Sequence, residues 1–281
     1  MKKFRKIILA GAMFLLPCGL TFAQSSTQTS ARQRAISDLK QVAYAGDVQA
    51  QVQLGLIYLT GDGVAKDDAE AMKWLRKAAD QDDPAAERYL AEMYFKGRGA
   101  PVDDAEAAKW LHMAADQGDA QSQHNLAVLY VQGLGVPRNL KEAANWMRKS
   151  ADQNLTAGLL GMGVLYENGD GVPEDHIEAA KWYQKAIDQG DVSAMNNLAL
   201  LMATSRNATV RNPQAAIALA NKLVASSNNP AYLDTLAAAY FANGQNDMAV
   251  AAEQKALARD PKNASYQKAL EKYLAAAHAG R

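Results

Sequence analysis

The stretch LGLIYLTGDGVAKDDAEAMKWLRKAADQ, residues 54–81, recurs in register along this chain. Its next copy, LAEMYFKGRGAPVDDAEAAKWLHMAADQ, occupies residues 90–117, a step of 36 residues. The only four tryptophans of the chain follow the same step, at Trp74, Trp110, Trp146 and Trp182. Four tyrosines follow it too, at Tyr58, Tyr94, Tyr130 and Tyr166. A fixed period of this length is typical of a solenoid, in which each repeat buries its apolar face only against its neighbours.

Each repeat is predicted to form two helices joined by a glycine turn. Leu54 and Tyr58 share a helical face because they are four residues apart, and Gly61 suits the left-handed conformation that ends such a helix. The second helix is predicted to begin at Asp67. Glu70 lies three residues further on, which is the spacing of a capping box, where the glutamate reaches back to the first backbone N–H.

These motifs resemble the Sel-one-like repeat (SLR), a member of the tetratricopeptide repeat (TPR) superfamily, and the resemblance runs from about residue 46 to residue 189. It implies an all-α, right-handed α-solenoid of antiparallel helix pairs, the SLR/TPR superhelix. A fifth unit departs from the pattern, because Met202 replaces the tyrosine and Ser205-Arg206-Asn207 replaces the glycine turn. The unit after it has the spacing of an ordinary TPR, with Leu233, Tyr240 and Pro261.

The chain is therefore divided into seven segments. They are a signal peptide (1–23), a flexible leader (24–30), an N-terminal capping helix (31–45), four SLR units (46–189), a divergent fifth repeat (190–228), a TPR unit (229–263), and a C-terminal capping helix with a tail (264–281). Atypical end units are expected where a solenoid meets water.

The N-terminus has the features of a secretory signal peptide. Lys2, Lys3, Arg5 and Lys6 precede the apolar run 7–16, and Thr21-Phe22-Ala23 offers small residues at a cleavage site. Cleavage after Ala23 predicts a periplasmic or secreted protein. A lipoprotein would need a small residue before Cys18, where Pro17 stands.

Cleavage would also remove the only cysteine, Cys18, and four basic residues, leaving 26 basic against 30 acidic residues. A mildly acidic chain gives no support for a nucleic-acid partner. No apolar run after the signal segment reaches the roughly 18 residues of a membrane span, so the mature chain is expected to have none.

Three patterns could indicate other chemistry. The tryptophan column could stack ligands, but the flanking residues follow a buried-face pattern, which favours core packing. The acidic residues near Asp67 lack the spacing of a calcium loop, and the four histidines are scattered singly. No G-x-S-x-G motif is present, the cysteine pairs of β-lactam-linked relatives are missing, and no S-x-x-K serves as a substitute. The sequence therefore predicts no enzyme, no metal and no cofactor.

The resemblance implies that the first helix of each repeat lines a concave groove that binds a protein or peptide partner. The residues predicted to face this groove mix amides, charges and an aromatic ring, a composition suited to gripping an extended segment. They are Gln53, Arg88, Tyr89, Glu92, His124, Asn125 and Asn197. The irregular turn 203–214 is an alternative binding surface.

The predicted function is that of an exported, non-catalytic scaffold or adaptor. Two alternatives stay open: a scaffold that binds cell wall or polysaccharide, and an enzyme acting on cell-wall or β-lactam substrates. The first would need exposed aromatic residues, and only Tyr89 and Phe95 qualify as candidates. The second would need a catalytic constellation that the sequence does not display.

Overall fold

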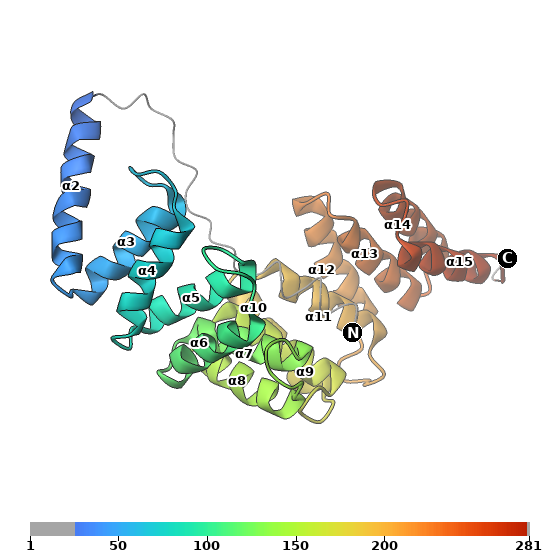
Figure 1. The fold of residues 1–281 in the computed structure, drawn as a ribbon. Coiled ribbons are helices and arrows are strands. Elements are labelled where there is room, and N and C mark those ends of the chain that lie inside the picture. The colour runs from blue at the N-terminus through green and yellow to red at the C-terminus, as the bar shows by residue number, and fades with distance from the viewer. Residues whose placement is uncertain (1–25, 280–281) are drawn as a thin grey trace. The chain divides into compact units, whose positions relative to one another are not determined.

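The computed structural model describes residues 26–279, and side chains from residue 31 onward. The predicted signal peptide 1–23, with its cleavage site and Cys18, lies outside this part. Within it the chain forms fourteen helices and no strand, an all-α repeat solenoid (Figure 1). No helix in residues 26–279 is both long enough and apolar enough to cross a membrane.

The chain divides into two compact units, with the boundary after Gly158 inside helix α9. The described part of the first unit holds α2–α8, with bounds α2 Ser26–Tyr44, α3 Val48–Thr60, α4 Asp68–Ala79, α5 Pro84–Lys96, α6 Asp104–Asp116, α7 Ala120–Gln132 and α8 Leu140–Asp152. The second unit begins within α9 (Thr156–Asn168). It continues with α10 His176–Asp188, α11 Val192–Thr204, α12 Pro213–Ser226, α13 Pro230–Ala242, α14 Asn246–Arg259 and α15 Ala264–Ala279.

Helix α2 differs from the prediction at its start. It begins at Ser26, so the leader predicted for 24–30 is helical from that residue onward. Ile36 and Ala43 of α2 pack against Leu54 and Trp74 of the first repeat, which covers the apolar end of the stack. This packing gives α2 the role of a cap.

In the four regular repeats the first helix ends at the predicted glycine. Gly61, Gly97 and Gly133 adopt φ values of 75°, 66° and 71°, in the left-handed region. The second glycine of the turn is needed for space as well: a Cβ on Gly135 would lie 1.9 Å from the carbonyl oxygen of Asp104. The turn therefore packs directly on the backbone of the preceding repeat.

The second helix begins at the predicted cap, but the capping box is only half formed. The carboxylate of Asp103 accepts hydrogen bonds from the backbone N–H groups of Ala105 and Glu106, both at 3.0 Å. The prediction that Glu106 reaches back to the Asp103 N–H is wrong. That N–H donates to the carbonyl oxygen of Tyr94 at 3.1 Å, and Glu106 pairs with Lys109 instead.

The tryptophan column belongs to the core. The four indoles are between 2% and 8% exposed, and small residues let the paired helices approach them. The indole N–H groups of the first two repeats differ in their partners. Trp74 Nε1 donates to the Glu70 carboxylate at 3.0 Å, and Trp110 Nε1 is buried without a partner.

Glycine next to the buried leucine or methionine makes room for the second helix. In the fourth repeat a Cβ on Gly163 of α9 would lie 2.4 Å from the ring of Tyr183 on α10. Tyr183 is fully buried and donates from its hydroxyl to Glu167 at 2.5 Å. A large ring and a missing side chain thus fit together across this helix pair.

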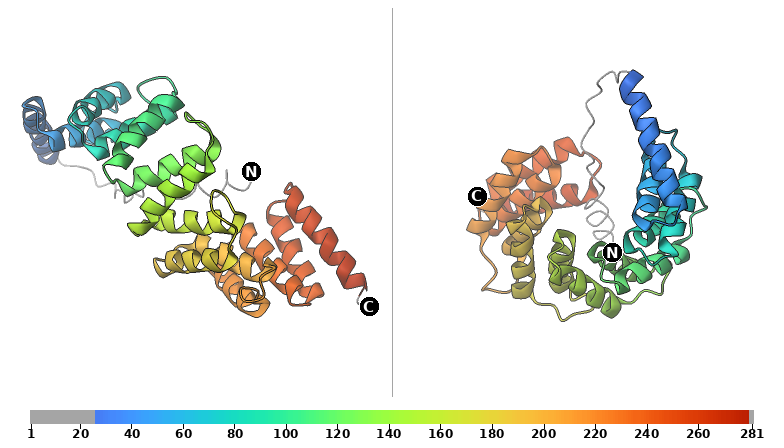
Figure 2. Two further views of the ribbon diagram at one scale, coloured as in Figure 1. Left: turned by 90° about the horizontal axis from the view of Figure 1, so that it is seen from below. Right: turned by 90° about the vertical axis from the view of Figure 1, so that its left-hand side faces the viewer.

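The second unit ends in a helix pair of different composition. Leu236 and Ala237 of α13 pack with Ala249 and Ala252 of α14, and Tyr273 of α15 closes this cluster. Both views of Figure 2 show α15 next to this last pair, where it contacts α14. The final helix therefore covers the apolar face that α14 would otherwise expose.

Candidate functional site

Most of the predicted partner-binding residues lie in the first unit, on the first helices α3, α5 and α7. Two contacts connect these helices at their starts. Gln49 Nε2 of α3 donates to Asp83, the N-cap of α5, at 3.1 Å, and Arg88 of α5 lies 3.2 Å from Asp119, the N-cap of α7. Asn197 lies on α11 in the second unit, so it is described separately.

Arg88 already has a carboxylate partner. Its side chain is 18% exposed, and its guanidinium pairs with Asp119 and lies 4.9 Å from the ring centre of Tyr89. The contact of Nε with Asp119 is electrostatic and not a well-aligned hydrogen bond, because this buried nitrogen has no hydrogen-bond partner. Arg88, which was predicted to face the groove, therefore joins α5 to α7 through Asp119.

His124 is not on the surface. It is 4% exposed, its Nδ1 has no hydrogen-bond partner, and burial lowers its pKa to about 4. The predicted groove position is therefore wrong for this residue. The sequence did contain a signal, because the same register position holds Val52 and Leu160 in other repeats, and Val52 is also buried.

Glu92 and Asn197 both form contacts within the protein. The Glu92 carboxylate accepts from Lys96 at 2.5 Å, one helical turn further on in α5. In the second unit Asn197 hydrogen-bonds to Tyr183, whose pKa burial raises well above its ordinary value. Glu92 remains at the surface as half of an ion pair, whereas Asn197 helps to hold α11 against α10.

The other three predicted residues, Gln53, Tyr89 and Asn125, form what we call the polar strip. They occupy the same register position on α3, α5 and α7, so stacking of the repeats aligns them. Gln53 is exposed, whereas Tyr89 and Asn125 are half-buried. Asn125 Oδ1 accepts from Gln121 at 3.0 Å, which leaves its amide N–H groups for a partner. The strip offers amide donors and acceptors around one aromatic ring.

The irregular turn after α11 contains a cluster that the sequence did not indicate. His176 Nδ1 lies 2.7 Å from Ser205 Oγ, and its Nε2 lies 3.3 Å from Glu174. These three residues resemble the serine–histidine–acid triad of a hydrolase. Ser205, however, is only 3% exposed, and its Oγ accepts a hydrogen bond from the Asn207 N–H at 3.0 Å. The contacts hold the turn in place where the other repeats use glycine.

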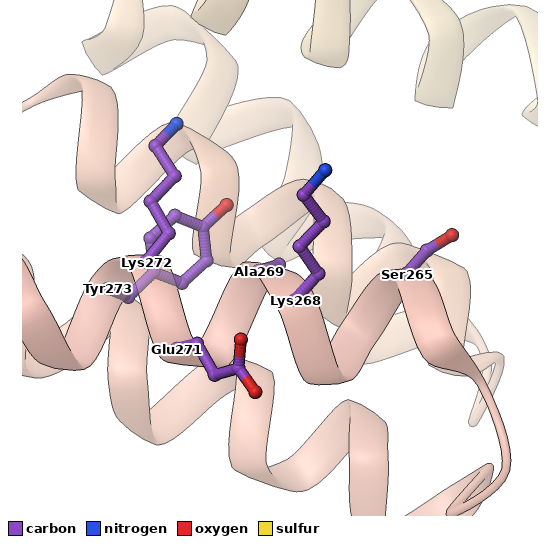
Figure 3. Close-up of a pocket in the computed structure, with 6 residues that line it drawn as sticks. All are labelled: Ser265, Lys268, Ala269, Glu271, Lys272 and Tyr273. Atoms are coloured by element: carbon purple, nitrogen blue, oxygen red, sulfur yellow. The ribbon is translucent and has the colours of Figure 1, made fainter.

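Two shallow hollows in the second unit are open to solvent, and neither forms an enclosed site. One lies beside this turn and is lined by Glu174, Asp175, His176, Ile177, Arg206 and Asn207. The other lies on α15 alone, where Lys268 and Lys272 point away from Glu271 (Figure 3). Residues 26–279 contain no group of three or more histidine, cysteine or acidic side chains that could hold a metal ion.

Comparison with protein families finds one match. The family described as Sel1 repeat matches five consecutive stretches, at residues 48–83, 84–119, 120–155, 156–191 and 192–227. The fifth match covers the unit with the irregular turn. No curated protein matches this chain.

Comparison with solved structures finds similar helical repeats. A protective antigen present in uropathogenic Escherichia coli strains, displaying an SLR fold, is 33% identical with a TM-score of 0.72 over 84% of this chain. The chain spans only 50% of that protein. A Sel1 repeat protein from Oxalobacter formigenes is 26% identical, with a TM-score of 0.64 over 76% of this chain and 90% of that one. The APC/C Cut9–Hcn1 structure, 17% identical with a TM-score of 0.58 over 88% of this chain and 48% of that one, shares the fold.

Proposed function

Because this chain belongs to the Sel1 repeat family, we propose that it is an exported, non-catalytic scaffold that holds protein or peptide partners on the first helices of its repeats. The Sel1 and tetratricopeptide repeat fold is typical of scaffolds for protein–protein interaction. The observation that carries the proposal is the polar strip in the first unit. Its members recur at one register position while their neighbours Arg88 and His124 are taken up by internal packing.

The strip suits an extended peptide segment. Gln53 and Asn125 can pair with backbone N–H and C=O groups, which every peptide presents regardless of its sequence. Tyr89 adds a large contact area at a low cost in side-chain entropy, and Arg88 beneath it holds the ring by a cation–π contact. Preorganised aromatic and amide groups of this kind are the usual anchors of an interface.

Export rests on two supports. The basic residues and apolar run at 2–16, followed by Thr21-Phe22-Ala23, have the order of a cleavable signal. The similar E. coli protein is a protective antigen, which fits a protein that leaves the cytoplasm. We propose the periplasm or the exterior as the location of the mature chain.

The test is capture of partners by the tagged protein from its own host, followed by crosslinking and mass spectrometry. Replacing Gln53, Tyr89 and Asn125 together by alanine is expected to abolish recovery of the partners while the thermal melting curve shifts little. A matched control is Asn145→Ala, which removes an exposed amide from the second helix α8. Full retention of every partner by the triple variant would place the binding surface elsewhere, on the 203–214 turn or the α13–α14 pair.

A polysaccharide-binding scaffold has less support. Such a surface needs aromatic faces open to solvent, and of the two candidates Tyr89 is half-buried against Arg88 while Phe95 is 37% exposed. An enzyme acting on cell-wall or β-lactam substrates has less still, because the one serine–histidine pair described above has a buried serine. Binding of a protein or peptide partner is therefore the best-supported function.

A further inference from the structure

A recurring side-chain hydrogen bond connects the two helices within each of the first three repeats. Near the end of each second helix a glutamine donates from Nε2 to a side-chain oxygen thirty residues earlier. The three bonds join Gln81 to Gln51, Gln117 to Glu87, and Gln153 to Gln123, each at 2.9 Å. The acceptor is a glutamine in the first and third repeats and a glutamate in the second.

The acceptor glutamines make a second bond that shows what this position requires. Gln51 Nε2 donates to the carbonyl oxygen of Ala43 at 3.0 Å, and Gln123 Nε2 donates to that of Ala115 at 3.1 Å. Both bonds span eight residues and are buried. By the same spacing of eight residues, the equivalent bond of the second repeat would join residue 87 to the carbonyl oxygen of Ala79, and it would need a donor on the side chain of residue 87.

An ionised glutamate has no donor. Glu87 is 0% exposed, and its Oε2 accepts the bond from Gln117. Its Oε1, the atom in the place of the glutamine Nε2, is buried without a hydrogen-bond partner. If the group were a carboxylate, this oxygen would face a carbonyl oxygen in a site without water, which is strongly unfavourable. If it were a carboxylic acid, it would reproduce both glutamine bonds.

We propose that Glu87 is a protonated acid in the folded second repeat, donating to the carbonyl oxygen of Ala79, and that its ionisation loosens the joint between α4 and α5. The acid acts as a pH-sensitive element where neighbouring repeats carry a pH-insensitive glutamine. The joint lies next to Arg88 and Tyr89, so loosening it would also disturb the polar strip.

The electrostatic surroundings of Glu87 also favour its protonated form. Burial, followed by the carboxylates of Asp82, Asp83 and Asp119, raises the pKa of Glu87 to about 7 against the opposing hydrogen bond from Gln117. Asp82 lies in the turn before α5, Asp83 is the N-cap of α5 and Asp119 is the N-cap of α7. Arg88, the next residue along α5, pairs with Asp119.

The sign of the pH dependence follows from the two states. The pKa of Glu87 is about 7 in the folded protein and has the ordinary value of 4.5 when unfolded. Between these pH values the folded state holds a proton that the unfolded chain has released, so stability falls as pH rises. The contribution is complete below pH 4.5 and is lost as pH passes through 7.

The experiment compares the full mature chain with Glu87→Gln by thermal melting and hydrogen exchange at pH 5 and pH 8. The wild type is expected to lose melting temperature between these pH values, and its α4–α5 amides to lose protection. Glu87→Gln should lose much less of both. Because burial and Asp234 raise the pKa of Glu253 in the second unit to about 8, both proteins share that other pH dependence, and their difference isolates Glu87.

Gln123→Glu is the matched reverse change, since it places an acid at the equivalent position of the third repeat. It should add a new loss of stability between pH 5 and pH 8, with reduced protection at the α6–α7 joint. A carboxyl-carbon NMR titration of wild-type Glu87 provides a direct reading that does not depend on either variant. Parallel pH profiles for wild type and Glu87→Gln, or titration of Glu87 near its ordinary pKa, would overturn the proposal.

Discussion

The two acidic residues Asp103 and Glu106, at the start of α6, have different roles. Asp103 satisfies backbone N–H groups that the helix itself cannot pair, whereas Glu106 forms an exposed ion pair with Lys109 at 3.5 Å. The sequence spacing suggested that both acids take part in one capping box. Only the structure distinguishes them, because the N–H that the glutamate would reach is already bonded to Tyr94.

This distinction predicts unequal effects of two alanine substitutions. Asp103→Ala should cost about 1 kcal/mol of unfolding free energy, because it leaves two helix N–H groups without their acceptor. Glu106→Ala should cost only about 0.5 kcal/mol, as is usual for an exposed ion pair. Urea denaturation of both variants gives the comparison. Equal losses would show that the glutamate contributes to the cap after all.

Burial of individual positions was the part of the site that the sequence predicted least well. A period of 36 residues identifies equivalent positions but not their exposure, since exposure depends on which neighbouring helix covers each one. His124 shows the difficulty, because its polar side chain suggested a surface position while the helices packed around it bury it. Arg88 was placed correctly on its helix, but its partner Asp119 lies in the next repeat, where sequence spacing alone did not reveal the contact.

Helices, by contrast, were predicted well. In the four regular repeats, glycine in the left-handed conformation ends the first helix and aspartate or asparagine caps the second, because these residue types satisfy local backbone requirements. The main exception at this scale is α2, whose start at Ser26 was predicted as leader. Its first residues, STQTS, lack the apolar periodicity on which such a prediction depends.

The pairing of Gly163 with Tyr183 predicts a rescue between two helices. Gly163→Ala should destabilise the protein by about 1–3 kcal/mol, because the new Cβ would meet the Tyr183 ring. The second repeat holds Ala91 and Leu111 at the equivalent positions, so adding Tyr183→Leu should recover part of the loss. Tyr183→Leu alone, which loses the bond to Glu167, is the control. Additive losses in the double variant would contradict the packing argument.

The whole chain combines five matched Sel1 repeats with end elements of other composition. The repeat match covers residues 48–227, and α2 at one end and α13–α15 at the other lie outside it. These outer elements carry apolar clusters of their own, with Ile36 in α2 and Tyr273 in α15. Periodicity predicted the repeats because identity recurs; the end elements depended on weaker, non-repeating patterns.

Export of the whole molecule gives a prediction that is independent of the fold. The mature protein is expected to begin at Gln24, because cleavage follows small residues at Thr21 and Ala23. N-terminal sequencing of protein from the periplasmic fraction is the measurement. Ala23→Arg should block processing and serves as the matched control. A mature chain that starts at a lipid-modified Cys18 would contradict the proposed soluble export.

The backbone bond between the two helices of each pair has a consequence for how these proteins can change. In the four regular repeats the second helix's N-cap N–H donates to the carbonyl nine residues earlier, as from Asp67 to Tyr58 at 3.0 Å. In the fifth repeat the same bond runs from Asn212 to Met202 at 2.9 Å, ten residues apart and without the glycine turn. Because no side chain takes part, the connecting loop can gain residues and change composition while the hairpin remains closed. The loop is thus a site where lineages, or a protein engineer, can lengthen the chain and add a new recognition segment without rebuilding the scaffold.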